Sequence, residues 1–242
     1  MNGSSNDSMS ERNVIEVMRS LSVGTVQQAL QRVGLRRSFV SGLRPLADDT
    51  VLAGRARTIR TVPFREDVPG LRGTVLATSD PRVPLIEDLH TDDVLVLAAR
   101  GVLTAGVLGD LMAERIRQRG AAGVVTDGAV RDIVGLAAVG LPIFAGGFHA
   151  ATFRSAHEAV ESDVPVDCGG VLVVPGDYLL GDREGVVVIP AAKITEVLDA
   201  AVAQDDMDQF LLAKLQQGAA LTDVQPPAER FVREYEQQRA SR

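Results

Sequence analysis

An acidic residue and an Arg-Asp pair bracket the stretch GDLMAERIRQRGAAGVVTDGAVRD, which runs from Gly109 to Asp132. Asp110 lies at its start and Arg131-Asp132 at its end. A carboxylate is a hard oxygen ligand of the kind that Mg²⁺ takes, and a guanidinium offers a planar fork to an anion or a carbonyl oxygen. Brought together, these groups would suit a small anionic substrate and a divalent metal ion.

The intervening residues predict a helix and a strand that bring the two ends together. Apolar residues recur on one face over 107–119, which predicts a helix, and AGVVTDG (122–128) is typical of a short buried strand. The first N–H groups of a helix lack partners within it and lie at the positive end of its dipole. The amides of Gly109–Met112 therefore suit a small carboxylate, and Gly109 lets a ligand approach the backbone closely.

Two interpretations of the charged residues are open. In the first, Arg131 binds the same anion, Asp132 ligates Mg²⁺, and Asp110 holds one of the waters of the metal. Such a site would suit a 2-oxo acid, because a metal polarises its carbonyl and stabilises an enolate. In the second, Asp110 is a favourable first-turn acid and Arg131-Asp132 is a solvated helix start. The spacing alone favours the second.

Composition narrows the function classes. The chain has 242 residues, of which 45% are hydrophobic, and a net charge of −7, which argues against a general nucleic-acid binder. Its single cysteine, Cys168, cannot form an intrachain disulfide, which favours a cytoplasmic setting. The N-terminus lacks the apolar run of a signal peptide, and no uninterrupted apolar stretch is long enough for a membrane span.

The order of predicted elements favours a mixed α/β sandwich rather than a doubly wound sheet. We expect a disordered leader at 1–10, a single domain at 11–217 and a C-terminal helical extension at 218–242. Periodicity and turn residues predict helices at 11–21, 22–34 (with a Ser22 or Thr25 cap), 107–119, 131–140, 191–218 and 226–242, strands at 51–64, 92–100, 122–128 and 141–147, and a β meander at 165–190 with Gly-Asp turns at 176–177 and 181–182.

Several ordered motifs together resemble the RraA-like family, which includes the 4-hydroxy-4-methyl-2-oxoglutarate aldolases. That family has an Asp, twenty intervening residues and then Arg-Asp, as do Asp110 and Arg131-Asp132. The resemblance extends from about residue 50 to 215. Four further family motifs are matched by Gly109-Asp110-Leu111-Met112, by RGAAGVVTDG (119–128), by CGGVLVVPGD (168–177) and by DREGVVVIP (182–190).

The resemblance implies an RraA-type α/β/β sandwich, similar to swivelling domains, with N- and C-terminal helices. It implies a metal-dependent class II aldolase or lyase that releases pyruvate from a small 2-oxo acid, with oxaloacetate decarboxylation as a second activity. The backbone at Gly109–Met112 would bind the substrate carboxylate, Arg131 would bind substrate, and Asp132 would ligate Mg²⁺ or Mn²⁺. Arg131 and Asp110 are then the expected catalytic residues, in a homotrimer or homohexamer.

One departure bears on the substrate. The family often has Phe-Ala-Arg-Gly where this chain has Phe144-Ala145-Gly146-Gly147. His149 could replace the missing arginine, or it is a loop histidine with no ligand role. The alternative function is a regulatory protein that binds a ribonuclease or an RNA-processing partner without catalysis, and a third is a sugar-acid lyase or dehydratase. The REDVP loop (65–69) could reach a neighbouring subunit, or it is a plain solvated loop.

Overall fold

The computed structural model describes residues 11–67 and 80–240, with Glu11 and Arg12 described by their backbone alone. The expected leader at 1–10 and the last two residues of the REDVP loop lie outside the described residues. The strands are β1 (Phe39–Val40), β2 (Arg44–Pro45), β3 (Leu52–Pro63), β4 (Asp93–Ala98), β5 (Gly123–Val130), β6 (Ile143–Phe148), β7 (His157–Ser162), β8 (Val166–Cys168), β9 (Val171–Val173), β10 (Tyr178–Asp182) and β11 (Gly185–Ile189). The α-helices are α1 (Glu11–Ser20), α2 (Val23–Arg32), α3 (Arg82–Glu87), α4 (Asp110–Gln118), α5 (Ile133–Val139), α6 (Ile194–Gln216), α7 (Leu221–Val224) and α8 (Glu229–Ala240).

A parallel run of four strands forms the centre of the main sheet. Within the described residues the strand order is β1-β11-β10-β3-β4-β5-β6-β2, with β7 antiparallel to β3. Strands β3, β4, β5 and β6 are parallel, in a register that pairs Val94 with Gly123 and Val124 with Ile143. β5 is buried along its whole length, as expected for a parallel strand that is covered on both faces.

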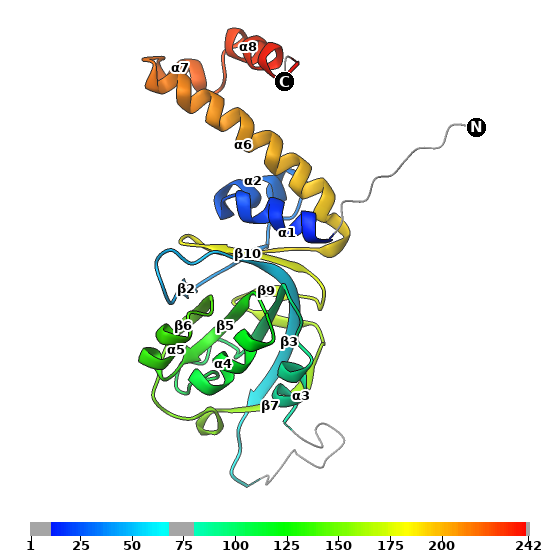
Figure 1. Cartoon of the computed structure of the whole chain (residues 1–242), viewed down its shortest axis with the longest axis vertical. Helices are drawn as coiled ribbons and strands as arrows, with labels where there is room; N and C mark the ends of the chain where they lie inside the picture. Colours follow the sequence, from blue (N-terminus) through cyan, green and yellow to red (C-terminus); the bar gives the residue numbers. More distant parts are fainter. Residues whose placement is uncertain (1–10, 68–79, 241–242) are drawn as a thin grey trace, which may run out of the picture.

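Helices cover one face of these strands and β structure covers the other (Figure 1). Apolar residues of α3, α4 and α5 pack with Leu95, Leu97 and Val124 on the first face. The β8–β9 hairpin and parts of β10 and β11 pack with Val94, Val96 and Val125 on the second. This is the expected mixed α/β architecture, and the fold class is confirmed.

The N-terminal helices form a further layer with the first part of α6. They pack against the outer faces of β10 and β11 through a third apolar cluster. Ser22 caps α2, because its hydroxyl accepts a hydrogen bond from the Thr25 N–H at 3.0 Å. Asp182 also accepts the N–H of Val23 at 2.8 Å, which ties the start of α2 to the end of β10.

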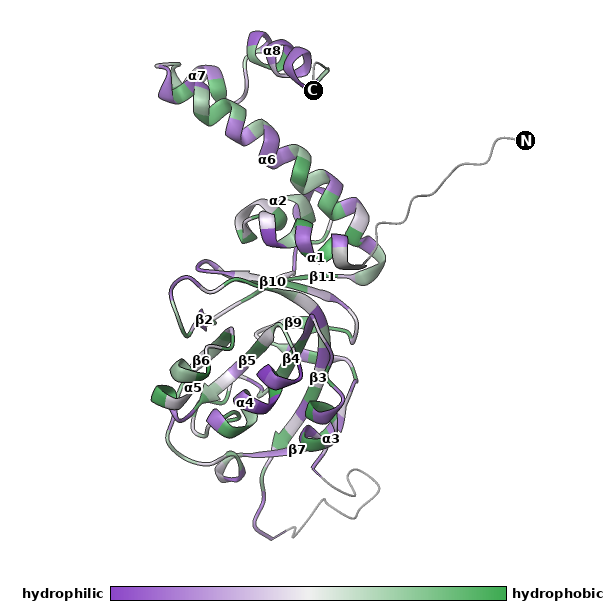
Figure 2. Cartoon of the chain, in the orientation of Figure 1, coloured by the Kyte–Doolittle hydropathy of each residue, from purple (hydrophilic) through white to green (hydrophobic). Residues whose placement is uncertain are grey.

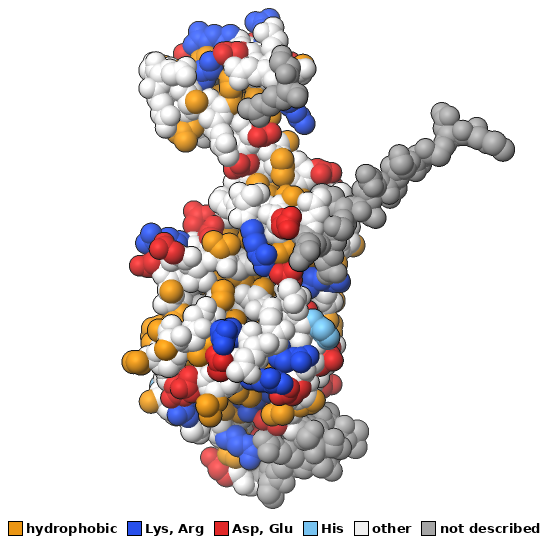
Figure 3. Space-filling model, viewed as in Figure 1, with side chains coloured by type: hydrophobic (Ala, Val, Ile, Leu, Met, Phe, Trp, Pro, Cys, Tyr) orange, Lys and Arg blue, Asp and Glu red, His pale blue; other side chains and the backbone are white. Residues whose placement is uncertain are grey.

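The second half of α6 extends beyond this layer and carries α7 and α8 at its far end (Figures 1 and 2). We call residues 203–240 the C-terminal arm. Among the residues that the structure describes, its apolar cluster has three buried members, Leu211, Val224 and Phe231. Leu212 and Leu221 stay exposed, and Figure 3 shows apolar side chains on the surface of the arm. The described helices include none that is both long and apolar enough to span a membrane.

The predicted β meander is wrong, because residues 165–190 form two hairpins in two different sheets. β8 and β9 pair only with each other in a two-stranded sheet, whereas β10 and β11 belong to the main sheet. Gly181 and Asp182 are the last residues of β10, so the predicted turn at 181–182 lies two residues too early. Gly181 does not form a turn but packs against Phe144. A Cβ at position 181 would lie 2.8 Å from the Phe144 ring, so the contact requires glycine.

Five strands and α-helices escape prediction, and the helix of the site begins later than expected. The short β1 and β2, the strand β7, the six-residue α3 and the four-residue α7 were not predicted. The sequence of β7 is HEAVES, which does not look like a buried strand because it is rich in charged and polar residues. Nevertheless His157 and Glu158 are buried. The helix predicted to begin at 107 begins at Asp110, because Gly106 and Val107 pair with the end of β5.

Candidate active site

The segment before α4 pairs with the end of β5, and this pairing brings the predicted site together. Gly106 forms a parallel bridge with Ala129, and the Val107 N–H donates to the Ala129 carbonyl at 2.8 Å. The Arg131 N–H in turn donates to the Leu108 carbonyl at 2.9 Å. The start of α4 and the Arg131-Asp132 pair therefore meet at the carboxyl edge of the parallel strands, where α/β proteins place ligands.

Asp132 has a left-handed backbone and faces the glycine that precedes α4. Its φ is 57°, a conformation that aspartate tolerates better than most residues. A Cβ at Gly109 would lie 2.6 Å from Asp132 Oδ2, so only glycine leaves room for this carboxylate. The carboxylate accepts two hydrogen bonds from Arg131, from Nε at 3.0 Å and from Nη2 at 3.2 Å. Both side chains are about one-third exposed, at 32% and 37%.

Asp110 is the first residue of α4, and its carboxylate lies between the start of α4 and α5. Oδ1 accepts the N–H of Leu111 at 2.8 Å. A Cβ at Gly135 of α5 would lie 2.5 Å from Oδ2. The Leu111 amide is thus already engaged by the protein, and a ligand carboxylate at this helix start must share or displace the Asp110 side chain.

All six predicted site residues line one cavity of about 330 Å³. Gly109, Asp110, Leu111 and Met112 contribute from the start of α4, and Arg131 and Asp132 from the end of β5. Sequence reasoning missed the other lining residues, which are Arg82, Gly106, Val107, Leu108, Thr152 and Phe153.

The missed Arg82 and Phe153 form one wall of the cavity with His157 behind them. The Arg82 guanidinium lies 3.4 Å from the centroid of the Phe153 ring. Phe153 stacks in turn on the His157 ring, with the centroids 5.5 Å apart. Asp80 fixes the arginine through bonds of 3.0 Å from Nε and 2.7 Å from Nη2. A cation held over an aromatic face in this way is a rigid arrangement.

Comparison with known proteins identifies the family. A family model described as "RraA-like: Aldolase/RraA" matches residues 23–188, more than half of the chain. This chain belongs to the RraA-like family.

Some similar proteins are named as aldolases and others as inhibitors of RNA processing. A protein of Halalkalibacterium halodurans named "Putative 4-hydroxy-4-methyl-2-oxoglutarate aldolase" is 31% identical over 84% of this chain and 88% of its own length. The crystal structure of Streptomyces coelicolor RraAS2, described as an unusual member of the RNase ES inhibitor RraA family, has a TM-score of 0.74 and 31% identity, covering 84% of this chain and 97% of that one. The structure of the RNA-processing inhibitor RraA from Thermus thermophilis has a TM-score of 0.50 and 27% identity, covering 68% and 92%.

Gly146 stands where the family arginine is expected, and the space beside it is occupied by Asp127 and Leu103. A Cβ at Gly146 would lie 2.8 Å from the Asp127 carbonyl oxygen and 3.1 Å from Leu103 Cδ2. His149, the residue that could replace the arginine, is exposed, accepts the Ala151 N–H at 3.1 Å and is not among the residues that line the cavity.

Asp127 anchors the loop that leads from β4 to the site. The side chain is 7% exposed. Its Oδ1 accepts the Ala99 N–H at 2.6 Å, and its Oδ2 accepts the N–H groups of Gly101 at 2.8 Å and Gly169 at 3.4 Å. Asp127, the aspartate of the VTDG motif, therefore holds the backbone of neighbouring loops in place by accepting their N–H groups.

Cys168 has the properties of a structural residue. It is fully buried, and burial raises the pKa of its thiol far above the ordinary value. A thiol of raised pKa is a poor nucleophile at neutral pH. It is therefore a small buried residue and not a candidate nucleophile.

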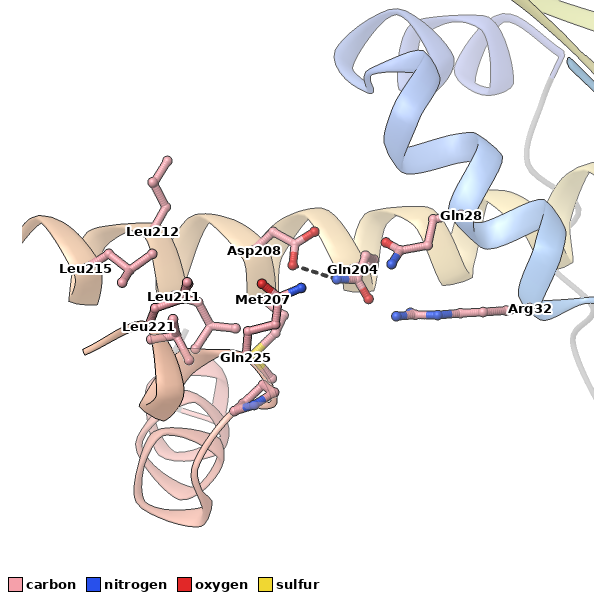
Figure 4. Close-up of a pocket in the computed structure, with 12 residues that line it drawn as sticks. Gln28, Arg32, Gln204, Met207, Asp208, Leu211, Leu212, Leu215, Leu221 and Gln225 are labelled. Atoms are coloured by element: carbon pink, nitrogen blue, oxygen red, sulfur yellow. Dashed lines mark hydrogen bonds between the residues drawn. The ribbon is translucent and has the colours of Figure 1, made fainter. Parts of the chain in front are cut away.

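A larger cavity of about 570 Å³ lies between α2 and the C-terminal arm (Figure 4). Its lining is mostly apolar, with residues such as Met207, Leu211 and Leu215. Among the described residues that line it, Arg32 and Asp208 are the charged ones, and Asp208 accepts a hydrogen bond from Gln204 at 2.6 Å. This cavity lacks the paired acid and cation near helix amides that distinguish the smaller one.

A divalent metal ion fits the donor set of the smaller cavity. Among the described residues no three His, Cys, Asp or Glu side chains gather into a metal cluster. Mg²⁺ does not need one, since it is commonly held by one or two carboxylates and keeps several waters. Asp132 supplies one carboxylate, and the space that Gly109 leaves beside Oδ2 gives access to it. The residues present therefore fit such an ion.

His157 should make the stability of the protein depend on pH. The ring is fully buried, and neither ring nitrogen makes a hydrogen bond of normal geometry to a described residue. Burial lowers the pKa of His157 below its ordinary 6.5, and the charges of Arg100 and Arg82 act in the same direction, against the Ala105 carbonyl and Asp127. As the pH falls below 6.5, the unfolded chain takes up a proton before the folded protein does, so stability is lost.

We expect the variant His157→Phe to lose less stability than the wild type between about pH 7.5 and about pH 5.5. Phenylalanine keeps the stack on Phe153 and cannot take up a proton. Urea unfolding at both pH values measures the difference, with a variant of the exposed His90, His90→Gln, as the control. Equal losses in the wild type and in His157→Phe would show that His157 does not cause the pH dependence.

Proposed function

We propose that this RraA-like protein is a divalent-metal-dependent carbon–carbon lyase. It releases pyruvate from a small 2-oxo acid similar to 4-hydroxy-4-methyl-2-oxoglutarate, and it decarboxylates oxaloacetate. The observation that carries the proposal is the meeting of a helix start with an arginine and an aspartate across Gly109, in one cavity. The aldolase name of the Halalkalibacterium halodurans relative supports the same reaction class.

Asp132 would hold Mg²⁺ or Mn²⁺, and the amides of Gly109–Met112 would receive the substrate carboxylate. When bound, the metal would polarise the 2-oxo carbonyl and stabilise the negative charge that develops as the carbon–carbon bond breaks. The amides suit an anion because they lie at the positive end of the α4 dipole.

Arg131 would bind the substrate by exchanging partners. In the structure its fork is taken by Asp132, but this ion pair is partly exposed, and such pairs contribute only about 0–1 kcal/mol. Opening the pair frees the guanidinium for the substrate carboxylate or carbonyl oxygen and frees the Asp132 carboxylate for its ligand. A bidentate bond to an anion is a strong charge-assisted one, so the exchange is favourable.

Asp110 would orient the water that moves the proton. Its carboxylate is held in place by the Leu111 N–H and by the surface of α5 at Gly135. A fixed carboxylate at the cavity wall can accept a hydrogen bond from a water and direct its proton to the pyruvate carbanion.

Gly109→Ala tests the geometry of this proposal directly. The new Cβ would lie 2.6 Å from Asp132 Oδ2, while the φ of −125° is one that alanine adopts freely. We expect the fold to survive and kcat/KM for pyruvate release to fall by about 10- to 100-fold, the effect of disturbing the setting of a metal ligand. Gly147→Ala is the matched control, because its Cβ would meet Leu103 at an ordinary 3.6 Å. Equal activity in both variants would contradict the proposed geometry.

The decisive experiment follows pyruvate release from oxaloacetate and from 4-hydroxy-4-methyl-2-oxoglutarate, with Mg²⁺ or with EDTA. We expect metal-dependent pyruvate from at least one of them. No pyruvate from either, together with no Mg²⁺-dependent rise in melting temperature on adding pyruvate or oxalate, would refute the enzyme assignment. We also expect a homotrimer or homohexamer, which light scattering would establish.

A second candidate is a regulatory protein that binds a ribonuclease or another RNA-processing partner without catalysis. The structural similarity to RraAS2 favours it, and the acidic net charge of −7 suits a partner with basic segments. A protein of this kind has no need for pyruvate, so the absence of a pyruvate-induced thermal shift would bring this candidate forward.

A further inference from the structure

Arg82 brings a second cation to the cavity, and nothing in the proposed chemistry uses it. It is the first residue of the short α3 and is only 8% exposed, although it lines the cavity beside Val107 and Phe153. A buried guanidinium is costly to desolvate unless it is paired. Asp80 provides the pairing, and the Phe153 ring provides the surface on which the guanidinium lies.

The bonds of Arg82 leave part of the guanidinium available. Asp80 takes the edge formed by Nε and Nη2, with bonds of 3.0 Å and 2.7 Å. Nη1 makes one long bond of 3.4 Å, to the Val107 carbonyl. A guanidinium has five N–H donors, and these three bonds leave two of them without an acceptor among the described residues. The Nη1 end adjoins Val107, which itself lines the cavity.

We propose that Arg82 is the subsite for a second carboxylate, so that the cavity selects 2-oxo acids with an acid group at each end. This inference rests on the proposed function, in which the amides of Gly109–Met112 and Arg131 hold the 2-oxo end. A planar fork fixed over an aromatic ring suits a carboxylate, which binds it in a bidentate manner.

The subsite predicts a particular pattern with oxaloacetate. The carboxylate that Arg82 binds would be the one that leaves as neutral CO2, so the contact stabilises the bound substrate and not the transition state. Loss of such a contact raises KM without lowering kcat. A merely structural role for Arg82 would lower kcat as well, because it would disturb the neighbouring catalytic groups.

The test is calorimetric titration of the full chain, in saturating Mg²⁺, with pyruvate, 2-oxopentanoate and 2-oxoglutarate. The last two share a five-carbon chain and differ in whether it ends in a methyl or a carboxylate. We expect the wild type to bind 2-oxoglutarate about 10- to 100-fold more tightly than 2-oxopentanoate, the usual effect of a hydrogen-bonded charge pair. In Arg82→Gln this preference should vanish while the affinity for pyruvate stays the same.

Arg117→Gln is the matched control, because Arg117 is exposed at the other end of α4 and pairs with Glu114 there. It should keep the wild-type preference. Arg82→Lys keeps the positive charge but lacks the planar guanidinium, so it should retain part of the preference for 2-oxoglutarate. This variant also tests the subsite if Arg82→Gln does not fold. A wild type that binds pyruvate but does not prefer 2-oxoglutarate, or an Arg82→Lys variant with an undiminished preference, would overturn the subsite alone. A wild type that does not bind pyruvate would overturn the proposed function and the subsite together.

Discussion

Asp132→Asn should lower kcat/KM for pyruvate release by about 10³-fold or more, because it removes the charged oxygen ligand proposed for the metal. Charge stabilisation by a metal supplies several kcal/mol in the transition state, and each 1.36 kcal/mol corresponds to about tenfold in rate. Asparagine is the right replacement, since it tolerates the left-handed backbone that φ = 57° requires. Alanine would add backbone strain at this position and confuse the result.

Asp92→Asn is the matched control, because Asp92 also has a positive φ, at 65°, and also pairs with an arginine, Arg19, at 2.8 Å. It should keep wild-type activity. The expected readouts for Asp132→Asn are steady-state kinetics, an unchanged melting temperature in EDTA, and a weakened rise of that temperature on adding Mg²⁺. Near-normal kinetics in Asp132→Asn would exclude Asp132 as the metal ligand.

Asp127→Ala should lower the free energy of unfolding by about 3–5 kcal/mol, a large part of the total stability of a typical domain. The substitution leaves the buried N–H of Ala99 and the part-buried N–H groups of Gly101 and Gly169 without their acceptor. Each buried donor left unpaired costs about 1–3 kcal/mol, so three such donors would cost about 3–9 kcal/mol. Because water can reach two of the three, we expect a loss in the lower part of that range. Urea unfolding measures the loss.

Two further variants sharpen this result. Asp127→Asn keeps one acceptor oxygen and should lie between the wild type and Asp127→Ala. Asp167→Ala is the control, because that aspartate accepts a single N–H, from Gly170 at 3.0 Å, in an exposed turn. If Asp127→Ala were no less stable than Asp167→Ala, the three backbone bonds of Asp127 would not matter to the fold.

The strands of the centre and the main site residues could be predicted because local patterns encode them. The buried apolar runs at 92–100 and 122–128 correspond to β4 and β5. The order of motifs placed Asp110, Arg131 and Asp132 at neighbouring ends of two elements, and the structure brings them into one cavity.

The rest depends on contacts between residues far apart in the chain. Arg82 meets Phe153 across 71 positions, and the helix that carries Arg82 is too short to show a period. The left-handed backbone of Asp132 arises because β5 must end and α5 begin within two residues. A periodicity argument cannot detect either feature, since both are set by tertiary packing.

The C-terminal arm has a consequence for how the molecule moves through solution. A compact body of a given mass has a small radius and little friction, whereas a helix that extends from it adds friction with little mass. The chain should therefore diffuse more slowly than a compact globular protein of equal mass. Gel filtration against compact standards will overstate its mass, and the number of copies in an assembly must be measured by a method that reports mass directly.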